Sequence, residues 1–157
     1  YKGEPRFDVF QRWLYELIEY FKTSHIRASR RVPRLKHFLG GRANIFFMRE
    51  VAQTPKKWTL DDFLSKLFDH CFPANFRTEQ RLKLNDATQR GRTVREWVLE
   101  LRNLADCVGD VSERQLVLHF WKGSESYICE RWAEAGYNVE VSSFDELELA
   151  AERYEEA

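Results

Sequence analysis

Hydrophobic residues recur at helical spacing along most of the chain, and most regularly after Thr93. The apolar positions from there to Val108 fall three and four residues apart, so they share one side of a helix; they are Val94, Trp97, Val98, Leu101, Leu104, Ala105 and Val108. Thr93 and Glu96 have the spacing of a capping box, in which each side chain bonds a free amide of the first helical turn. The pattern predicts a buried helix that begins at Thr93, directly after a polar turn at residues 89–92.

Similar stripes predict further helices on both sides of this one. The first runs from Phe7 to about Thr23, and others follow Thr59, Ser112 and Ser143, whose hydroxyls are suited to capping a helix. With the shorter apolar runs included, we expect about nine helices in all. The 7 Gly and 4 Pro are few for an all-β protein of 157 residues, so we assign the chain to the all-α class.

A helix-breaking stretch at residues 72–76 (FPANF) divides the sequence into halves of opposite charge. Residues 1–73 hold 14 Lys or Arg against 8 Asp or Glu, a net charge of +6, and residues 74–157 hold 11 against 17, a net charge of −6. We expect two small helical lobes, 1–73 and 74–157, joined by a short linker, each large enough to fold alone. The complementary charges fit docking within one chain and docking between copies equally well.

The chain has none of the motifs that mark a catalytic or zinc site. Its 4 histidines are scattered, and neither an H-E-x-x-H nor a G-x-S-x-G motif occurs. Cys71, Cys107 and Cys129 are far apart in helical stretches, which favours free buried thiols over disulfides or zinc ligands. We expect no enzymatic activity, no cofactor, no metal and no small-molecule substrate. No apolar stretch approaches the roughly 18 residues of a membrane span, so we also expect no membrane association.

Four blocks of the sequence, taken in order, resemble the Gag capsid proteins of gypsy-type LTR retrotransposons. Gln89, the turn with Gly91 and the capped helix with Trp97 are similar to the major homology region of retroviral capsids, although Arg90 stands where retroviral versions usually have Gly. The residues that carry the other three blocks are Leu39, Gly40 and Ala43; then Trp58, Phe63, Leu67 and Phe72; and last Ser112, Glu113, Phe120 and Gly123.

This resemblance implies a structural function and not a catalytic one. It implies N-terminal-like and C-terminal-like capsid domains, self-assembly of many copies into a virus-like particle in the cytoplasm, and packaging of RNA by a region outside this chain. The residues expected to support assembly are Gln89, Gly91, Arg92, Thr93, Glu96 and Trp97. The alternative is a domesticated Gag-like domain that no longer assembles and instead binds a peptide or protein in an apolar groove.

Two segments of the first half are candidates for contact with partners. An aromatic stripe would line the groove of the domesticated form, or would simply be a wide core face; its residues are Val9, Trp13, Tyr20, Phe46 and Phe47. A basic patch follows the first helix and consists of Arg27, Arg30, Arg31, Arg34 and Lys36. Because it lacks the interleaved aromatic residues of a single-strand-binding platform, we favour a solvated helix or a charge patch between subunits over direct nucleic-acid binding.

Overall fold

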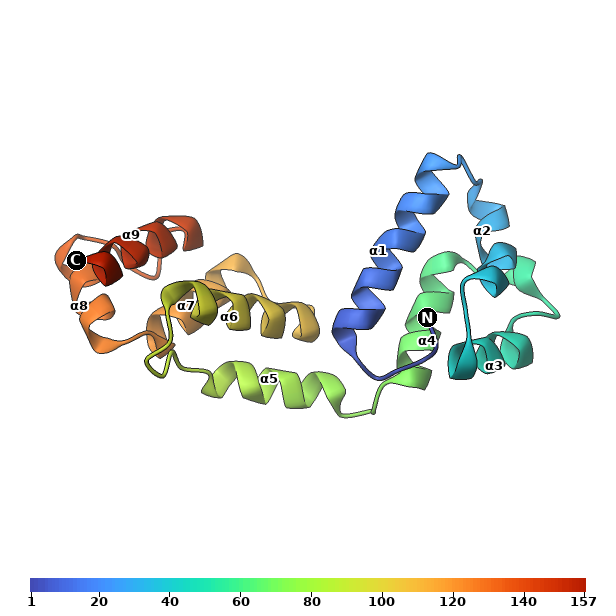
Figure 1. Ribbon diagram of the computed structural model, residues 1–157, viewed down its shortest axis with the longest axis horizontal. Helices are drawn as coiled ribbons and strands as arrows, with labels where there is room; N and C mark the ends of the chain where they lie inside the picture. The colour runs from blue at the N-terminus through green and yellow to red at the C-terminus, as the bar shows by residue number, and fades with distance from the viewer. The chain divides into compact units, whose positions relative to one another are not determined.

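The computed structural model describes all 157 residues and contains only helices and connecting loops (Figure 1). There are nine α-helices and two short 3-10 helices, which confirms the all-α prediction. The chain divides into two compact units, Tyr1–Ala74 and Asn75–Ala157, here called unit 1 and unit 2. None of the helices combines the length and the apolar character that crossing a membrane requires.

Unit 1 has its core between its longest helix, α1, and the helices that follow it. Its elements are α1 (Phe7–Thr23), α2 (Ala28–Arg34), the 3-10 helix η1 (Leu35–His37), α3 (Gly41–Glu50), the 3-10 helix η2 (Pro55–Lys57) and α4 (Leu60–Cys71). Helix α4 packs against both α2 and α3. The apolar stripes predicted from sequence face inward, and Phe21, Phe63 and Leu67 are among the side chains with no exposed surface.

Pro33 lies within α2, near the C-terminal end of that helix, which begins at Ala28. Because proline donates no amide hydrogen and restricts the backbone before it, it is tolerated poorly within a helix. The α-helix ends at Arg34, and the chain continues as η1.

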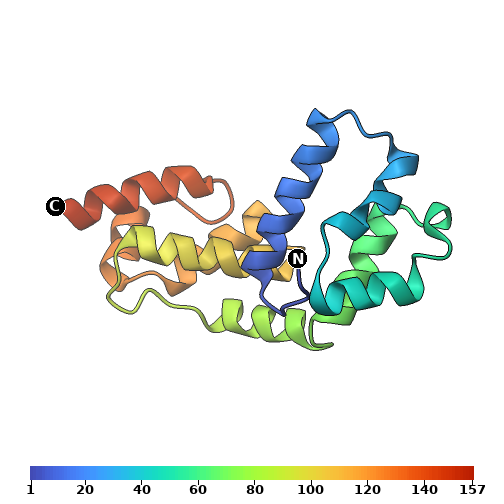
Figure 2. The same cartoon turned by 45° about the vertical axis from the view of Figure 1, so that its right-hand side comes forward.

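Unit 2 is arranged around α6 (Val94–Val108), the helix that the sequence predicts most clearly. The other helices are α5 (Phe76–Asp86), α7 (Glu113–Gly123), α8 (Ser126–Glu134) and α9 (Phe144–Glu156). Helix α6 packs against α5, α7 and α9, and α5 runs alongside it (Figure 2). The core of the unit includes the fully buried Trp97, Phe120 and Trp132.

Side-chain caps explain where the helices of unit 2 begin. Ser112 and Ser143 open α7 and α9 with complete capping boxes. Thr93 opens α6, but only half of the predicted box forms: its hydroxyl accepts a hydrogen bond from the Glu96 amide at 3.2 Å, and the Glu96 side chain does not return one. The Val94 amide donates to the Glu155 carboxylate at 2.7 Å, so α9 satisfies a different free amide in the first turn of α6.

Candidate functional site

Gln89 is the buried polar residue on which the turn before α6 depends. Its side chain is only 1% exposed. The amide nitrogen donates to the Arg92 carbonyl at 2.8 Å, and the amide oxygen accepts from the Glu125 backbone nitrogen at 3.0 Å. The Gln89 backbone nitrogen also donates to the Gly123 carbonyl at 2.8 Å. These bonds offset the cost of burying a polar side chain, and they join the turn to the segment between α7 and α8.

Arg92 folds back over the same turn. Its guanidinium donates to the Gln89 carbonyl at 3.0 Å and to the Thr88 carbonyl at 2.7 Å, and it forms an ion pair with Glu100 of α6. The guanidinium carbon also lies 5.8 Å from the ring centre of Trp97. A planar group with five donors in a fixed arrangement can serve acceptors in several directions at once, which the compact ammonium of a lysine would do less well.

The tip of the turn has a left-handed backbone at two successive residues. Gly91 has φ of 74°, a conformation that suits glycine, and Arg90 has φ of 53°, which is uncommon for a residue with a side chain. The Gly91 amide donates to the Glu125 carboxylate at 2.6 Å. Glu125 therefore holds the turn through its carboxylate, while its own backbone amide is held by Gln89.

Trp97 and Gly123 form the apolar side of this arrangement. Trp97 has no exposed surface, and its indole nitrogen donates to the Ser124 hydroxyl at 3.0 Å. A β-carbon on Gly123 would lie 2.6 Å from the Trp97 ring and 2.5 Å from the Ala87 carbonyl, so no side chain fits there. We refer to Gln89, Arg92, Trp97, Ser124 and Glu125 as the Gln89 network.

The structure brings together most of the site residues predicted from sequence. Gln89 and Arg92 are hydrogen-bonded to each other, the Arg92 guanidinium lies near the Trp97 ring, and Gly91 is linked to Gln89 through Glu125. Thr93 caps the start of α6. Glu96 does not belong to the network, because its side chain is exposed. Sequence reasoning missed Ser124 and Glu125. Nothing in the local pattern shows that Ser124 meets Trp97, 27 residues earlier, or that Glu125 meets the turn at Gln89 and Gly91.

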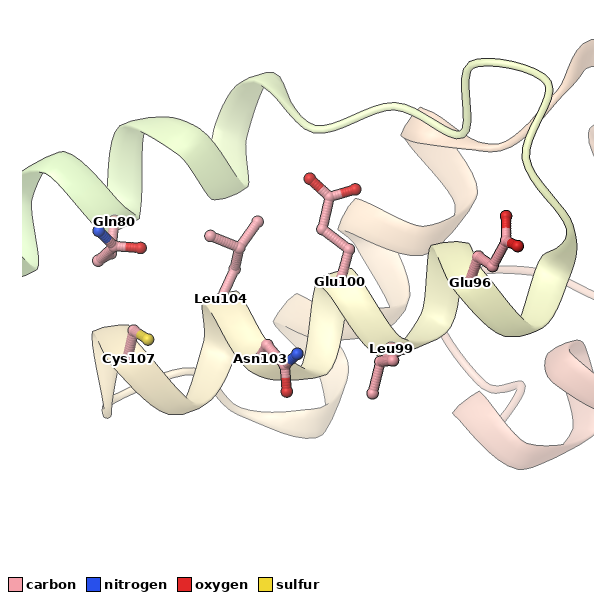
Figure 3. A pocket seen from close by; sticks show the side chains of 7 residues that line it. All are labelled: Gln80, Glu96, Leu99, Glu100, Asn103, Leu104 and Cys107. Atoms are coloured by element: carbon pink, nitrogen blue, oxygen red, sulfur yellow. The ribbon is translucent and has the colours of Figure 1, made fainter. Parts of the chain in front are cut away.

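An open groove runs between α5 and α6 (Figure 3) and has a volume of about 370 Å³. It is lined by Gln80, Glu96, Leu99, Glu100, Asn103, Leu104 and Cys107, and Leu99 is 62% exposed. The groove offers a mainly apolar surface to a partner.

Burial shifts the pKa of two thiols and one histidine. Burial raises the pKa of the Cys71 and Cys129 thiols, which keeps both protonated at neutral pH, whereas a nucleophilic thiolate needs a lowered pKa. Burial, together with the nearby Lys122, lowers the pKa of His119. No three His, Cys, Asp or Glu side chains lie close enough together to hold a metal ion.

The predicted aromatic stripe of unit 1 does not form one exposed surface. Phe46 and Phe47 are buried, at 7% and 2% exposed, and their rings lie 6.0 and 5.8 Å from that of Phe63. They belong to the core because α3 packs against α4 on that side.

The other residues of the stripe are also engaged within unit 1. The Trp13 ring stacks on Tyr1 at 5.4 Å, and its indole nitrogen donates to the Phe38 carbonyl at 3.1 Å. Val9 is half-buried, and the partly exposed Tyr20 ring lies 5.1 Å from that of Phe38. The interpretation of the stripe as a core face therefore accounts for most of its residues.

The predicted basic patch lies on α2 and η1, and one of its residues differs from the others. Arg31 is half-buried; its guanidinium donates to the Ile26 carbonyl at 3.1 Å and lies 5.6 Å from the Phe21 ring centre. It therefore helps to hold α2 in place. The exposed members of the patch are Arg27, Arg30, Arg34 and Lys36.

Comparison of the chain with models of protein families, with curated proteins and with solved structures gave no match. Its function is therefore inferred from its own residues and their geometry.

Proposed function

We propose that this chain is a Gag-type capsid protein of an LTR retrotransposon, whose copies assemble into a virus-like particle. The observation that carries the proposal is the Gln89 network, in which a buried glutamine on a polar turn fixes the entrance of α6. Gln89, Gly91 and Trp97 are the residues in which the sequence resembles the major homology region. Gly123, which ends another block of the resemblance, packs directly against Trp97.

The burial of Gln89 defines how the network serves assembly. A side chain that is 1% exposed cannot contact a neighbouring copy, so the network acts by fixing the shape of unit 2. A shell requires every copy to present the same surfaces at the same angles, because small errors accumulate over many repeated contacts. In this proposal, units 1 and 2 correspond to the N-terminal and C-terminal capsid domains, and each supplies contact surfaces of its own.

Exposed apolar side chains on unit 2 are suited to such contacts. They occur on all of its helices, and they are Leu82, Leu99, Leu118, Tyr127, Val141 and Leu149. Scattered leucines alone are ordinary on a protein surface. In an assembling protein, many small apolar contacts are sufficient, because the number of contacts per particle compensates for the weakness of each one.

Sedimentation of the purified chain over a range of concentration and salt, followed by negative-stain microscopy, tests the proposal. We expect fast-sedimenting species that are seen as rings, tubes or shells. The double variant Leu99→Gln, Leu149→Gln removes exposed leucines without touching the core, so it should reduce assembly and leave the circular dichroism spectrum unchanged. A chain that stays monomeric under all conditions would contradict the proposal.

A second candidate is the domesticated, non-assembling domain that binds a peptide or protein. The observation that favours it is the groove between α5 and α6, whose lining includes Leu99, Leu104 and Cys107. The aromatic stripe of unit 1 supports it less well, because Phe46 and Phe47 are buried. The sedimentation experiment separates the candidates, since this one requires a stable monomer.

A further inference from the structure

Helix α2 and the 3-10 helix η2 form a basic surface that the sequence alone does not reveal. The two elements pack against each other although about twenty residues separate them in the chain. Two lysines of η2 thereby join the exposed basic residues of α2 and η1. We define the α2–η2 surface by six exposed residues: Arg27, Arg30, Arg34, Lys36, Lys56 and Lys57.

The positive charge of this surface is not neutralised within unit 1. Between Glu19 and Glu50 there is no acidic residue in 30 positions, and the same stretch holds 8 Lys or Arg. The ion pairs of unit 1 are Arg6 with Asp8 and Arg49 with Glu50, so none involves the α2–η2 surface. Six exposed cations without ion pairs create a positive potential that attracts anionic partners.

The acidic unit 2 of a second copy is one possible partner, but many of its carboxylates are already engaged. Of its 17 acidic side chains, nine form ion pairs or hydrogen bonds within unit 2: Glu79, Glu100, Asp110, Glu113, Glu125, Asp145, Glu146, Glu152 and Glu155. These bonds cap helices or tie one helix to the next, so a docking surface that competed for them would weaken the unit.

An anionic membrane surface fits the α2–η2 surface less well. Binding at a lipid interface combines basic residues with apolar side chains that enter the acyl region. The large apolar side chains exposed on unit 1 are Tyr15, Tyr20, Ile45 and Met48, and all of them belong to α1 or α3. The surface therefore offers charge alone.

We propose that the α2–η2 surface binds nucleic acid through its phosphate backbone, without sequence preference. Arg30 and Arg34 are four residues apart, so they share one face of α2, and Arg27 directly precedes the helix. A guanidinium can bind a phosphate with two parallel hydrogen bonds. The absence of aromatic residues among the six predicts contact with phosphates and not stacking on bases. This inference does not depend on the capsid proposal. It places a nucleic-acid contact within residues 1–157, whereas the resemblance implies RNA packaging by a region outside this chain.

Fluorescence anisotropy with the full 157-residue chain tests this inference. A labelled single-stranded RNA of about 20 nucleotides and a DNA duplex of the same length serve as probes, from 50 to 200 mM salt. If all six cations contact phosphates, the logarithm of the RNA association constant should fall against log salt with a slope of about −4. RNAs of different sequence should bind with equal affinity, and a strong preference for one sequence would contradict contact through the backbone.

Charge-neutralising variants locate the binding surface. The triple variant Arg27→Gln, Arg30→Gln, Arg34→Gln should make the slope about 2 units shallower and weaken binding at 50 mM salt by tenfold or more. The double variant Lys56→Gln, Lys57→Gln should weaken binding in the same direction. If the binding surface consisted only of the basic residues between Arg27 and Lys36, this second variant would not change the affinity. It therefore tests whether η2 belongs to the surface.

A matched control removes the same charge elsewhere. Arg12, Lys66 and Lys83 are exposed residues outside the surface, and replacing all three with Gln should change affinity much less than the α2 triple variant. Equal losses for the two triples would mean that binding follows net charge alone, which would overturn the proposal. It would also be overturned if neither probe bound at 50 mM salt while the α2 triple abolished a low-salt association between copies, because the partner would then be the chain itself.

Discussion

The side-chain oxygen of Gln89 accepts a hydrogen bond from the backbone amide of Glu125 at 3.0 Å, across 36 residues of sequence. The Glu125 carboxylate in turn accepts a hydrogen bond from the backbone amide of Gly91 at 2.6 Å. The turn before α6 and the residue before α8 therefore hold each other in place, so a change on either side should alter the stability of unit 2 as a whole.

Replacing Gln89 with Met should lower the free energy of unfolding of unit 2. Methionine keeps the length of the side chain but leaves the Glu125 amide and the Arg92 carbonyl without their partner, which costs about 1 to 3 kcal/mol for each buried group that stays unsatisfied. Urea denaturation followed by tryptophan fluorescence measures the loss. Gln11→Met on the exposed side of α1 is the control, and equal stability of the two variants would argue against the network.

Trp97→Ala should unfold unit 2, since truncating a buried tryptophan typically costs about 3 to 5 kcal/mol and small domains are only marginally stable. Trp97→Phe retains most of the buried ring and loses the hydrogen bond to Ser124, so it should be tolerated far better. Amide NMR spectra would show which unit is affected. A folded, fully helical unit 2 in Trp97→Ala would show that the core can close around the cavity.

Gly123→Ala should destabilise unit 2 by about 1 to 3 kcal/mol, the usual cost of overpacking a core. The added carbon would meet the Trp97 ring and the Ala87 carbonyl, and a carbonyl of the main chain cannot move aside easily. Gly136→Ala is the comparison, because Gly136 has φ of 88° and no atom within 4 Å of the new carbon. That variant isolates the backbone cost, and thermal melts that rank Gly136→Ala as the worse of the two would contradict the packing argument.

Arg90→Gly should raise the stability of unit 2 slightly. Arg90 has φ of 53°, and the left-handed conformation costs roughly 1 to 2 kcal/mol in a residue with a β-carbon. Glycine relieves this strain, although its greater freedom in the unfolded chain offsets part of the gain. Arg90→Ala retains the β-carbon and should show no comparable increase in melting temperature. Equal melting temperatures for the Gly and Ala variants would indicate that the turn is not strained.

Glu148→Gln should stabilise the chain at neutral pH but not at low pH. Burial, with the nearby charges of Glu152 and Asp145, raises the pKa of Glu148 above its usual 4.5, although Arg102 and Arg95 oppose the shift. A raised pKa means that the folded chain binds the proton more tightly than the unfolded chain. The charged carboxylate therefore destabilises the fold above its folded-state pKa, and this effect disappears below about pH 4.5.

Melting temperatures at pH 7 and pH 4 measure this effect. The advantage of Glu148→Gln over the parent chain should be present at pH 7 and absent at pH 4. Glu134→Gln, at an exposed position of α8, is the control for the loss of one negative charge. An advantage of the same size at both pH values would assign the effect to packing and not to ionisation.

Local sequence pattern was sufficient to predict the helices and several of their caps. The stripe after Thr93 predicts the first residue of α6 correctly, because the residues on the buried face of a helix are apolar and recur at helical spacing. Ser112 with Gln115 and Ser143 with Glu146 form the expected capping boxes, since both partners lie within one turn of helix.

Contacts between distant segments could not be predicted in this way. Glu125 and Gln89 have no pattern in common, and their contact arises only when α7 returns the chain to the turn. The burial of Phe46 and Phe47 likewise follows from the position of α4, and the addition of Lys56 and Lys57 to the basic surface follows from the packing of η2 on α2. In each case tertiary packing determined which residues meet.

The bond between the Val94 amide and the Glu155 carboxylate sets an order of events during protein synthesis. The two residues are 61 positions apart, so at a translation rate of roughly 5 to 20 residues per second the cap arrives about 3 to 12 seconds after the helix start it completes. Unit 1 needs none of those later residues for its own core. Unit 1 can therefore fold while unit 2 still lacks α9, and any assembly that depends on unit 2 can begin only after α9 has been synthesised.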